Sequence, residues 1–220
     1  MTDRPILFSA PMVRALLAGT KTQTRRLIKN PEHWGCPTGD CPHNLQTECN
    51  ESMSSLRDEI TNYRVGDRLW VKETWRSTPA YDDLKPSDLG GDEPLNYLAD
   101  QGYFNWAEAD GDRHGKTRVS IFMPRWASRL TLTVTDVRVE RLQDISKDDA
   151  IAEGLHRHMP HSTEPSWAAT ADAAFNARYF GNPCHAYYDL WNSINGAGAW
   201  EQNPWVVAIS FNVEQRNIDQ

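Results

Sequence analysis

The chain has 220 residues, of which 39% are hydrophobic, and it carries a net charge of −7. This length and composition fit a single domain over residues 1–220. No apolar run approaches the length of a membrane-spanning helix, and the first residues do not resemble a secretory signal. Four irregularly spaced cysteines without such a signal favour free thiols in a reducing cytoplasm, where we expect the protein to act.

The charge is distributed unevenly along the chain. Residues 1–30 hold six basic residues and one acid, a balance of +5 that leaves −12 for the remainder. An acidic body disfavours broad nucleic-acid binding, because that binding depends on many phosphate contacts. A local basic pocket suits a small anionic or polar ligand, although a solvated, charged strand edge would give the same pattern.

The first predicted elements are a short helix and a strand. Residues 11–18 follow a possible N-cap, Ser9, and precede Gly19, which can end a helix. The threonine-rich segment after Gly19 favours a strand. Side chains two apart in a strand share a face, so four of them point one way: Thr22, Thr24, Arg26 and Ile28.

Lys21 lies at the turn that enters this strand. Its long side chain can reach over Thr24, so an amine, a hydroxyl and the guanidinium of Arg26 converge within a few residues. This combination predicts a reactive or binding site.

Two segments rich in turn-forming residues predict loop insertions, at about 30–64 and 77–118. The first contains four potential zinc ligands: Cys36, Cys41, His43 and Cys49. Their spacing is irregular and includes no C-x-x-C pair, so we expect unligated thiols and no metal. The second contains an aromatic run at residues 103–106, which predicts a short strand or a lid.

Residues 68–75 alternate as a strand does, with Glu73 and Trp75 on the same face as apolar neighbours. An acid in such a place is either a pocket residue or the partner of a buried base such as Arg26. Trp75 can stack on a flat heterocycle or simply pack in the core.

Residues 119–123 and 130–142 predict two further strands, the second being the strongest strand pattern in the chain. A helix over residues 146–153 follows, with Ser146 as N-cap and Asp149 in the reciprocal capping position. Glu153 falls on its last turn, where the helix dipole disfavours an acid. It is either a solvated surface residue or a carboxyl with a proton-transfer role.

The remaining chain predicts a helical C-terminal elaboration at about 156–200 and a closing strand over residues 205–213. The elaboration contains expected helices at 168–179 and 185–194, and a loop with His156, His158 and His161 that is more typical of a flexible surface than of a metal site. Many strands, few helices and no βαβ alternation predict an α+β fold, a mainly antiparallel β-barrel with flanking helices.

The stretch GTKTQTRR, residues 19–26, resembles the signature of the ASCH domain family, whose fold is a PUA-like β-barrel. Lys21, Thr24 and Arg26 fall on the G-x-K-T-x-T-x-R pattern of small bacterial N4-acetylcytidine amidohydrolases. The blocks ILFSAPMVRALLAGTKTQTRR and GDRLWVKETW are similar to longer ASCH proteins of phages and prophages. The resemblance covers residues 5–29, 65–76 and 130–155, and the insertions depart from the minimal enzymes.

The resemblance implies an amidohydrolase that removes the acyl group from N4-acylated cytidine or cytosine, with Glu153 at the position of the family's site glutamate. Thr24 would be the nucleophile, and Lys21 its base, provided that burial and the nearby arginines lower the pKa of the amine. Glu153 would protonate the leaving amine. We expect Arg26, Glu73 and Trp75 to bind the substrate.

This chemistry requires no cofactor and no metal. The alternative function is an RNA-binding or RNA-cleaving PUA-like module of phage or prophage origin, in which Lys21, Arg25 and Arg26 hold phosphates. The acidic body favours the small-molecule enzyme.

Overall fold

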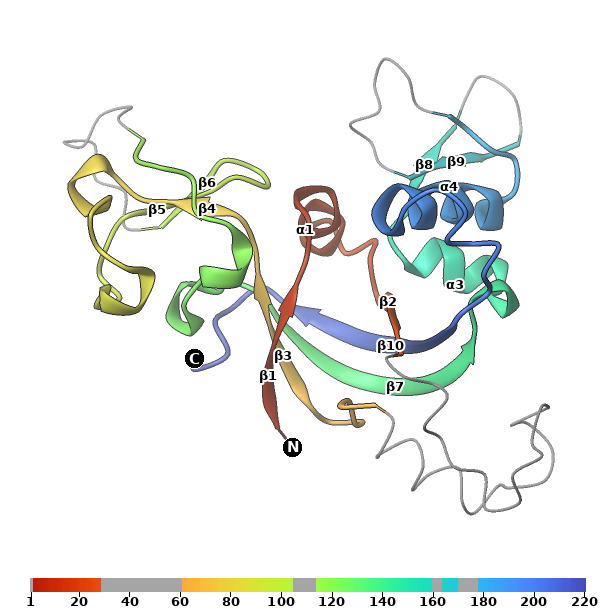
Figure 1. Cartoon of the computed structure of the whole chain (residues 1–220), viewed down its shortest axis with the longest axis horizontal. Helices are drawn as coiled ribbons and strands as arrows, with labels where there is room; N and C mark the ends of the chain where they lie inside the picture. Colours follow the sequence, from red (N-terminus) through yellow and green to blue (C-terminus); the bar gives the residue numbers. More distant parts are fainter. Residues whose placement is uncertain (1, 29–60, 105–113, 160–163, 170–177) are drawn as a thin grey trace.

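A computed structural model of the chain describes residues 2–28, 61–104, 114–159, 164–169 and 178–220 (Figure 1). Cys36, Cys41, His43, Cys49 and His161, which we considered as metal ligands, lie outside these ranges. Within the described residues, no helix is long and apolar enough to cross a membrane.

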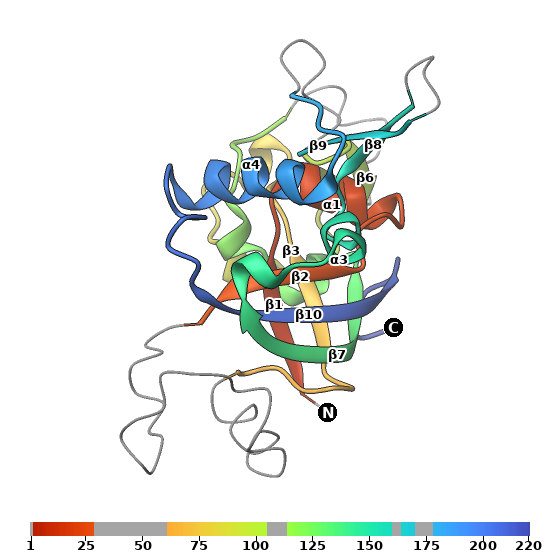
Figure 2. The ribbon, with the colours of Figure 1, turned by 90° about the vertical axis from the view of Figure 1, so that its right-hand side faces the viewer.

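A curved five-stranded sheet organises the fold, with the strand order β1-β3-β7-β10-β2 (Figures 1 and 2). Its strands are β1 (Asp3–Leu7), β3 (Arg68–Lys72), β7 (Thr131–Arg141), β10 (Trp205–Glu214) and β2 (Gln23–Leu27). The β1–β3 pair is parallel and the others are antiparallel. Among the described strands β1 and β2 form the two edges and do not pair, so the fold is a mixed α+β fold with an open sheet.

The concave side of this sheet holds the main hydrophobic core. The alternation of β7 buries Leu132, Val134 and Val137, and β10 adds Ile209. Helix α1 (Ala10–Leu17) packs its buried Val13 and Leu16 onto the same cluster. Burying such side chains contributes about 1.5–3 kcal/mol each, so the helix and the long strands stabilise each other.

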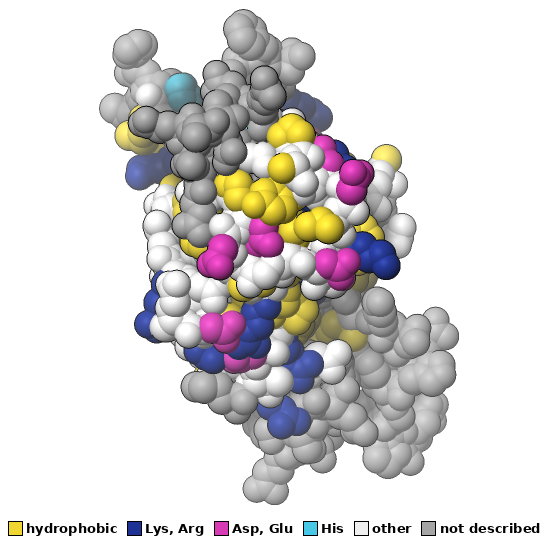
Figure 3. Space-filling view, turned by 90° about the vertical axis from the view of Figure 1, so that its left-hand side faces the viewer, with side chains coloured by type: hydrophobic (Ala, Val, Ile, Leu, Met, Phe, Trp, Pro, Cys, Tyr) yellow, Lys and Arg dark blue, Asp and Glu magenta, His cyan; other side chains and the backbone are white. Residues whose placement is uncertain are grey.

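A three-stranded sheet lies at one end of the molecule (Figure 1). It consists of β4 (Trp75–Arg76), β5 (Leu95–Tyr97) and β6 (Gly102–Phe104), and it encloses a second hydrophobic cluster. Short 3₁₀ helices surround it, at Pro79–Tyr81, Pro86–Asp88, Ser120–Phe122 and Arg125–Ala127. The face of this end shows hydrophobic side chains among acidic and basic ones (Figure 3).

The opposite end holds helix α3 (Lys147–Ala152), helix α4 (Pro183–Asn195) and the hairpin of β8 (His156–His158) and β9 (Ser166–Ala168). A 3₁₀ turn, Leu142–Asp144, joins β7 to α3. The two helices share a third cluster that includes Ala150, Tyr187 and Trp191. They lie along one side of the curved sheet formed by β2, β10 and β7 (Figure 2).

Several sequence predictions are confirmed. The long strand, the closing strand, the first helix and the helix near residue 190 all form within two residues of their expected bounds. Ser146 caps α3 by accepting a hydrogen bond from the Asp149 amide, at 3.1 Å. The β1 strand was not predicted, because its five residues carry no regular alternation.

One predicted strand is wrong. Residues 119–123 form no strand but a turn of 3₁₀ helix, in which Val119, Ile121 and Phe122 are exposed. Arg118 makes only a single bridge to Trp75 there, so the segment has no ladder to extend. Of the helix expected at 168–179, Ala168 belongs to strand β9, and residues 170–177 lie outside the described ranges.

The end of α3 docks directly on the start of β2. Lys21 and Glu153 form an isolated antiparallel bridge, and the Thr22 amide donates to the Ala152 carbonyl at 2.8 Å. Gly154 makes this approach possible: its φ is +89°, and an added Cβ would lie 2.8 Å from the Lys21 Cβ. Glycine alone combines this conformation with this closeness.

Gly154→Ala should therefore lower the free energy of unfolding by about 2–4 kcal/mol, the sum of left-handed strain and a steric clash. Gly19→Ala is the matched control, since Gly19 also has a positive φ, +70°, but has open space around its Cβ position. It should cost only about 1 kcal/mol. Urea denaturation measures both values, and equal losses would show that the contact with Lys21 is not tight.

Candidate active site

Lys21 is the most deeply buried charged residue at the junction of β2 and α3, with no exposed surface. Its Nζ donates to two oxygens of Glu153, the backbone carbonyl at 2.7 Å and Oε2 at 2.8 Å. Glu153 is itself only 3% exposed. The backbone bridge between these two residues places their side chains next to each other, so the backbone of the fold itself brings the pair together.

The second carboxylate oxygen of Glu153 has two further donors. Arg25 Nη1 lies 3.2 Å from Oε1, and the Tyr187 hydroxyl of α4 lies 3.3 Å from the same atom. Arg25 also pairs with Glu140 at 2.7 Å and with Asp149 at 3.5 Å. A buried carboxylate surrounded by an amine, a guanidinium and a phenol is fully hydrogen-bonded, as a buried charge must be.

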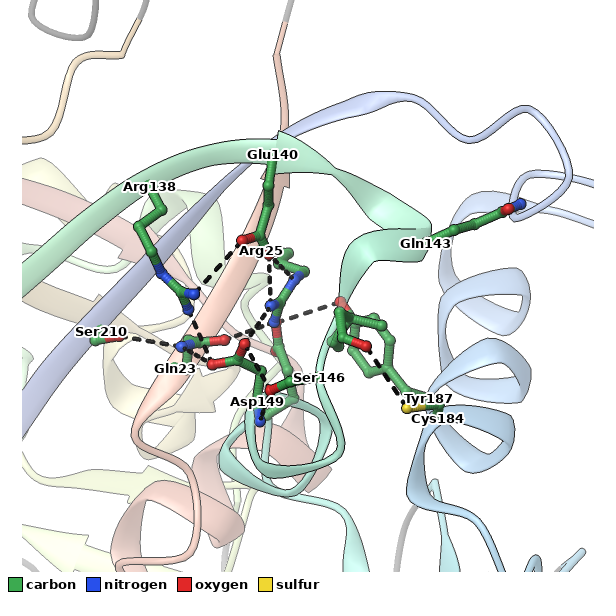
Figure 4. Close-up of polar contacts among 12 residues, drawn as sticks. Gln23, Arg25, Arg138, Glu140, Gln143, Ser146, Asp149, Cys184, Tyr187 and Ser210 are labelled. Carbon is green, nitrogen blue, oxygen red and sulfur yellow. Dashed lines mark hydrogen bonds and ion pairs between the residues drawn. The ribbon is translucent and has the colours of Figure 1, made fainter. Parts of the chain in front are cut away.

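A network of polar side chains next to Arg25 holds its guanidinium in position (Figure 4). Gln23 accepts from Arg25 at 2.6 Å and donates to Asp149 at 2.8 Å and to Ser210 at 3.1 Å. Arg138 donates to Asp149 at 2.9 Å. The network joins β2, β7, β10 and α3, so it fixes the direction in which Arg25 approaches Glu153.

A pocket of about 240 Å³ opens beside the pair, between β2 and α4. Its polar wall consists of Thr24, Arg25, Arg26, Glu153 and Tyr187. Its remaining wall is mainly apolar: Met12, Leu27, Leu190, Trp191, Ile194 and Asn195. Lys21 does not line the pocket, but its amine is hydrogen-bonded to Glu153, which does.

Burial lowers the pKa of the Lys21 amine, Glu153 opposes this effect, and Arg26 and Arg25 reinforce it. A neutral amine has two N–H donors and a lone pair, and the two Glu153 oxygens accept two hydrogen bonds. The observed contacts are therefore compatible with an amine that has lost a proton. Burial also raises the pKa of Tyr187, which keeps its phenol protonated as a donor.

The structure brings four of the predicted site residues together: Lys21, Thr24, Arg26 and Glu153. Arg26 donates to the Leu7 carbonyl at 2.7 Å and lies 5.1 Å from the centre of the Phe8 ring. Arg26 also lines the pocket. Thr24 is 3% exposed.

Glu73 and Trp75 lie elsewhere. The expected pair between Glu73 and Arg26 does not form: Arg129 donates to both carboxylate oxygens of Glu73, at 2.8 and 2.9 Å. Trp75 has no exposed surface and packs within that cluster, with Arg118 over its ring at 5.3 Å. Neither residue lines the pocket beside Thr24.

Tyr187 and Trp191 are pocket residues that the sequence interpretation missed. Both belong to a helix that was expected, and their spacing from Leu190 and Ile194 follows the i, i+3, i+4, i+7 pattern of one helical face. That pattern identifies the buried face of α4. It contains no sign that the face meets Glu153, which is 34 residues earlier in the chain.

Within the described residues, no group of three or more His, Cys, Asp or Glu side chains could hold a metal ion. Comparisons of the chain with protein-family models, with curated proteins and with solved structures found no match.

The Asp149 carboxylate makes the network sensitive to acid. Burial raises its pKa, but hydrogen bonds from Gln23, Arg138 and Ser146 outweigh this and lower it from 3.8 to about 2. A carboxyl whose pKa falls on folding stabilises the protein above its unfolded pKa, and this contribution disappears as the pH falls through the folded value.

Asp149→Asn should therefore lower the melting temperature at pH 6, and the difference from the wild type should shrink between pH 4 and pH 2. Asp148→Asn, an exposed neighbour in the same helical turn, is the control and should change little at any pH. Thermal unfolding across this pH range measures both. A difference for Asp149→Asn that stays constant with pH would contradict the assignment.

Proposed function

We propose that the protein is an amidohydrolase that removes the acyl group from an N4-acylated cytosine or cytidine. The observation that carries this proposal is the buried contact between Lys21 and Glu153, whose carboxylate lines the same pocket as Thr24. These are the three residues that the ASCH resemblance designates as catalytic. We also propose that the curved sheet is an ASCH variant of the PUA-like barrel and that the substrate is a cytoplasmic nucleoside.

The proposed reaction begins with attack by the Thr24 hydroxyl oxygen on the acyl carbon, while the Thr24 proton passes to the neutral Lys21 amine. The acyl oxygen becomes an anion, and the Arg26 guanidinium in the pocket wall stabilises it. The bond to N4 then breaks, and N4 takes a proton delivered through Glu153. Water subsequently hydrolyses the Thr24 ester, which releases the carboxylic acid and restores the hydroxyl.

The size of the pocket supports a small substrate. Sites for drug-sized ligands usually measure about 300–1,000 Å³, whereas this pocket measures about 240 Å³. Its walls combine cations with the flat side chains of Tyr187 and Trp191, which suit a planar, acceptor-rich ring.

Thr24→Ala should reduce deacylation of N4-acetylcytidine by a factor of about 10³ or more, because the attacking oxygen is gone. Lys21→Arg should be nearly inactive, since a guanidinium does not give up a proton to act as a base. Thr24→Ser should retain measurable activity, and Glu153→Gln should lower the rate by a factor of about 10² or more. Chromatography of cytidine and acetate measures all four variants.

Thr22→Ala is the control for this set, because Thr22 is an exposed threonine just before the same strand. It should have wild-type activity. Thermal unfolding of each variant separates lost chemistry from lost folding. Wild-type turnover by Thr24→Ala would show that Thr24 is only a strand residue.

The buried positions of the basic residues also argue against an RNA-binding role. Lys21 has no exposed surface and Arg25 is 5% exposed, and both are engaged by carboxylates, so they are not available to phosphates. We expect a gel shift with unmodified single-stranded RNA at physiological salt to show weak binding at most. A dissociation constant below 1 μM, as an order of magnitude, would favour the RNA-binding module instead.

A further inference from the structure

Tyr187 has a hydroxyl that the proposed reaction does not use. It is 3% exposed, comes from α4, and donates to Glu153 Oε1 at 3.3 Å. Arg25 donates to the same oxygen at 3.2 Å, while Lys21 contacts Oε2 at 2.8 Å. Two donors thus bind one carboxylate oxygen, Oε1, and the Lys21 amine binds the other, Oε2.

The ring of Tyr187 would pack equally well without its hydroxyl. The centre of the Tyr187 ring lies 6.2 Å from the ring centres of both Trp191 and Trp200, and the Arg25 Cζ atom lies 5.8 Å from it. These contacts use the faces and edges of the ring, which a phenylalanine also has. Burying a hydroxyl is unfavourable unless it is hydrogen-bonded, so the bond to Glu153 is what makes tyrosine suitable here.

We propose that Tyr187 is a positioning residue that acts through Glu153, an inference that rests on the proposed function. Its hydroxyl prevents the carboxylate from rotating, so that Oε2 stays on the Lys21 amine and the proton route through Glu153 remains aligned. Because burial keeps the phenol protonated, it acts as a donor throughout the working pH range. The C-terminal elaboration is therefore part of the active site.

Tyr187→Phe tests the hydroxyl alone. A hydrogen bond to a charged group is worth about 1.5–3 kcal/mol, so we expect kcat for N4-acetylcytidine to fall by about tenfold or more, with KM within about twofold. The acidic limb of the pH–rate profile should move to higher pH, because Glu153 opposes the lowering of the Lys21 pKa, and it does so more strongly when its charge has one donor fewer.

The matched control is Tyr188→Phe, since Tyr188 is the next residue of the same helix, is 37% exposed and has an edge-on contact with Trp200. It should leave kcat and the pH profile unchanged. In a Glu153→Gln background, Tyr187→Phe should cause little further loss, because both changes act on one group. Wild-type kinetics for Tyr187→Phe, or fully additive losses, would overturn the assignment.

A second measurement keeps the two proposals apart. If the wild type does not deacylate N4-acetylcytidine, the proposed function fails, and the positioning role is decided by NMR titration of the Lys21 Cε resonance, assigned with Lys21→Arg. Tyr187→Phe should shift the midpoint of this titration, and Tyr188→Phe should not. An identical midpoint in wild type and Tyr187→Phe would overturn the positioning role by itself.

Discussion

The buried contact between Lys21 and Glu153 is the constraint on which the rest of the site depends. An amine and a carboxylate without solvent need hydrogen-bond partners, and the fold brings these partners together. The backbone bridge sets the spacing, Arg25 and Tyr187 hold the remaining oxygen, and Gly154 permits the close approach.

The same arrangement determines what the amine can do. Burial and the adjacent arginines lower the pKa of Lys21, whereas Glu153 opposes them, so the balance of these contacts sets the proton affinity of the amine. Arg25 also forms ion pairs with Glu140 and Asp149, so these carboxylates share its positive charge with Glu153. The polar network of Figure 4 orients the Arg25 guanidinium and so acts indirectly on the proton affinity of Lys21, the proposed base.

The sequence predicted the elements with a strong internal pattern and missed what depends on distant contacts. The alternation over β7 and the capping residue Ser146 are sufficient to predict a strand and a helix start, because both patterns depend on local geometry. The strand expected over residues 119–123 does not form because a strand also needs a partner. Glu73 pairs with Arg129 and not with Arg26, because the packing of segments 56 residues apart sets that contact. The residue spacing places Tyr187 on the apolar face of a helix. Its hydrogen bond to Glu153, however, depends on how α4 packs on α3.

The position of α4 connects the fold to the proposed chemistry. A catalytic set drawn only from residues 19–26 and 153 would leave one side of the pocket open to water. Helix α4 closes that side with Leu190 and Trp191 and at the same time delivers the Tyr187 hydroxyl to the carboxylate. Excluding water strengthens each electrostatic contact inside the pocket, since the effective dielectric constant falls. Helix α4 therefore contributes to the site in two ways that reinforce each other: it lines the pocket, and it donates a hydrogen bond to the carboxylate that the proposed reaction requires.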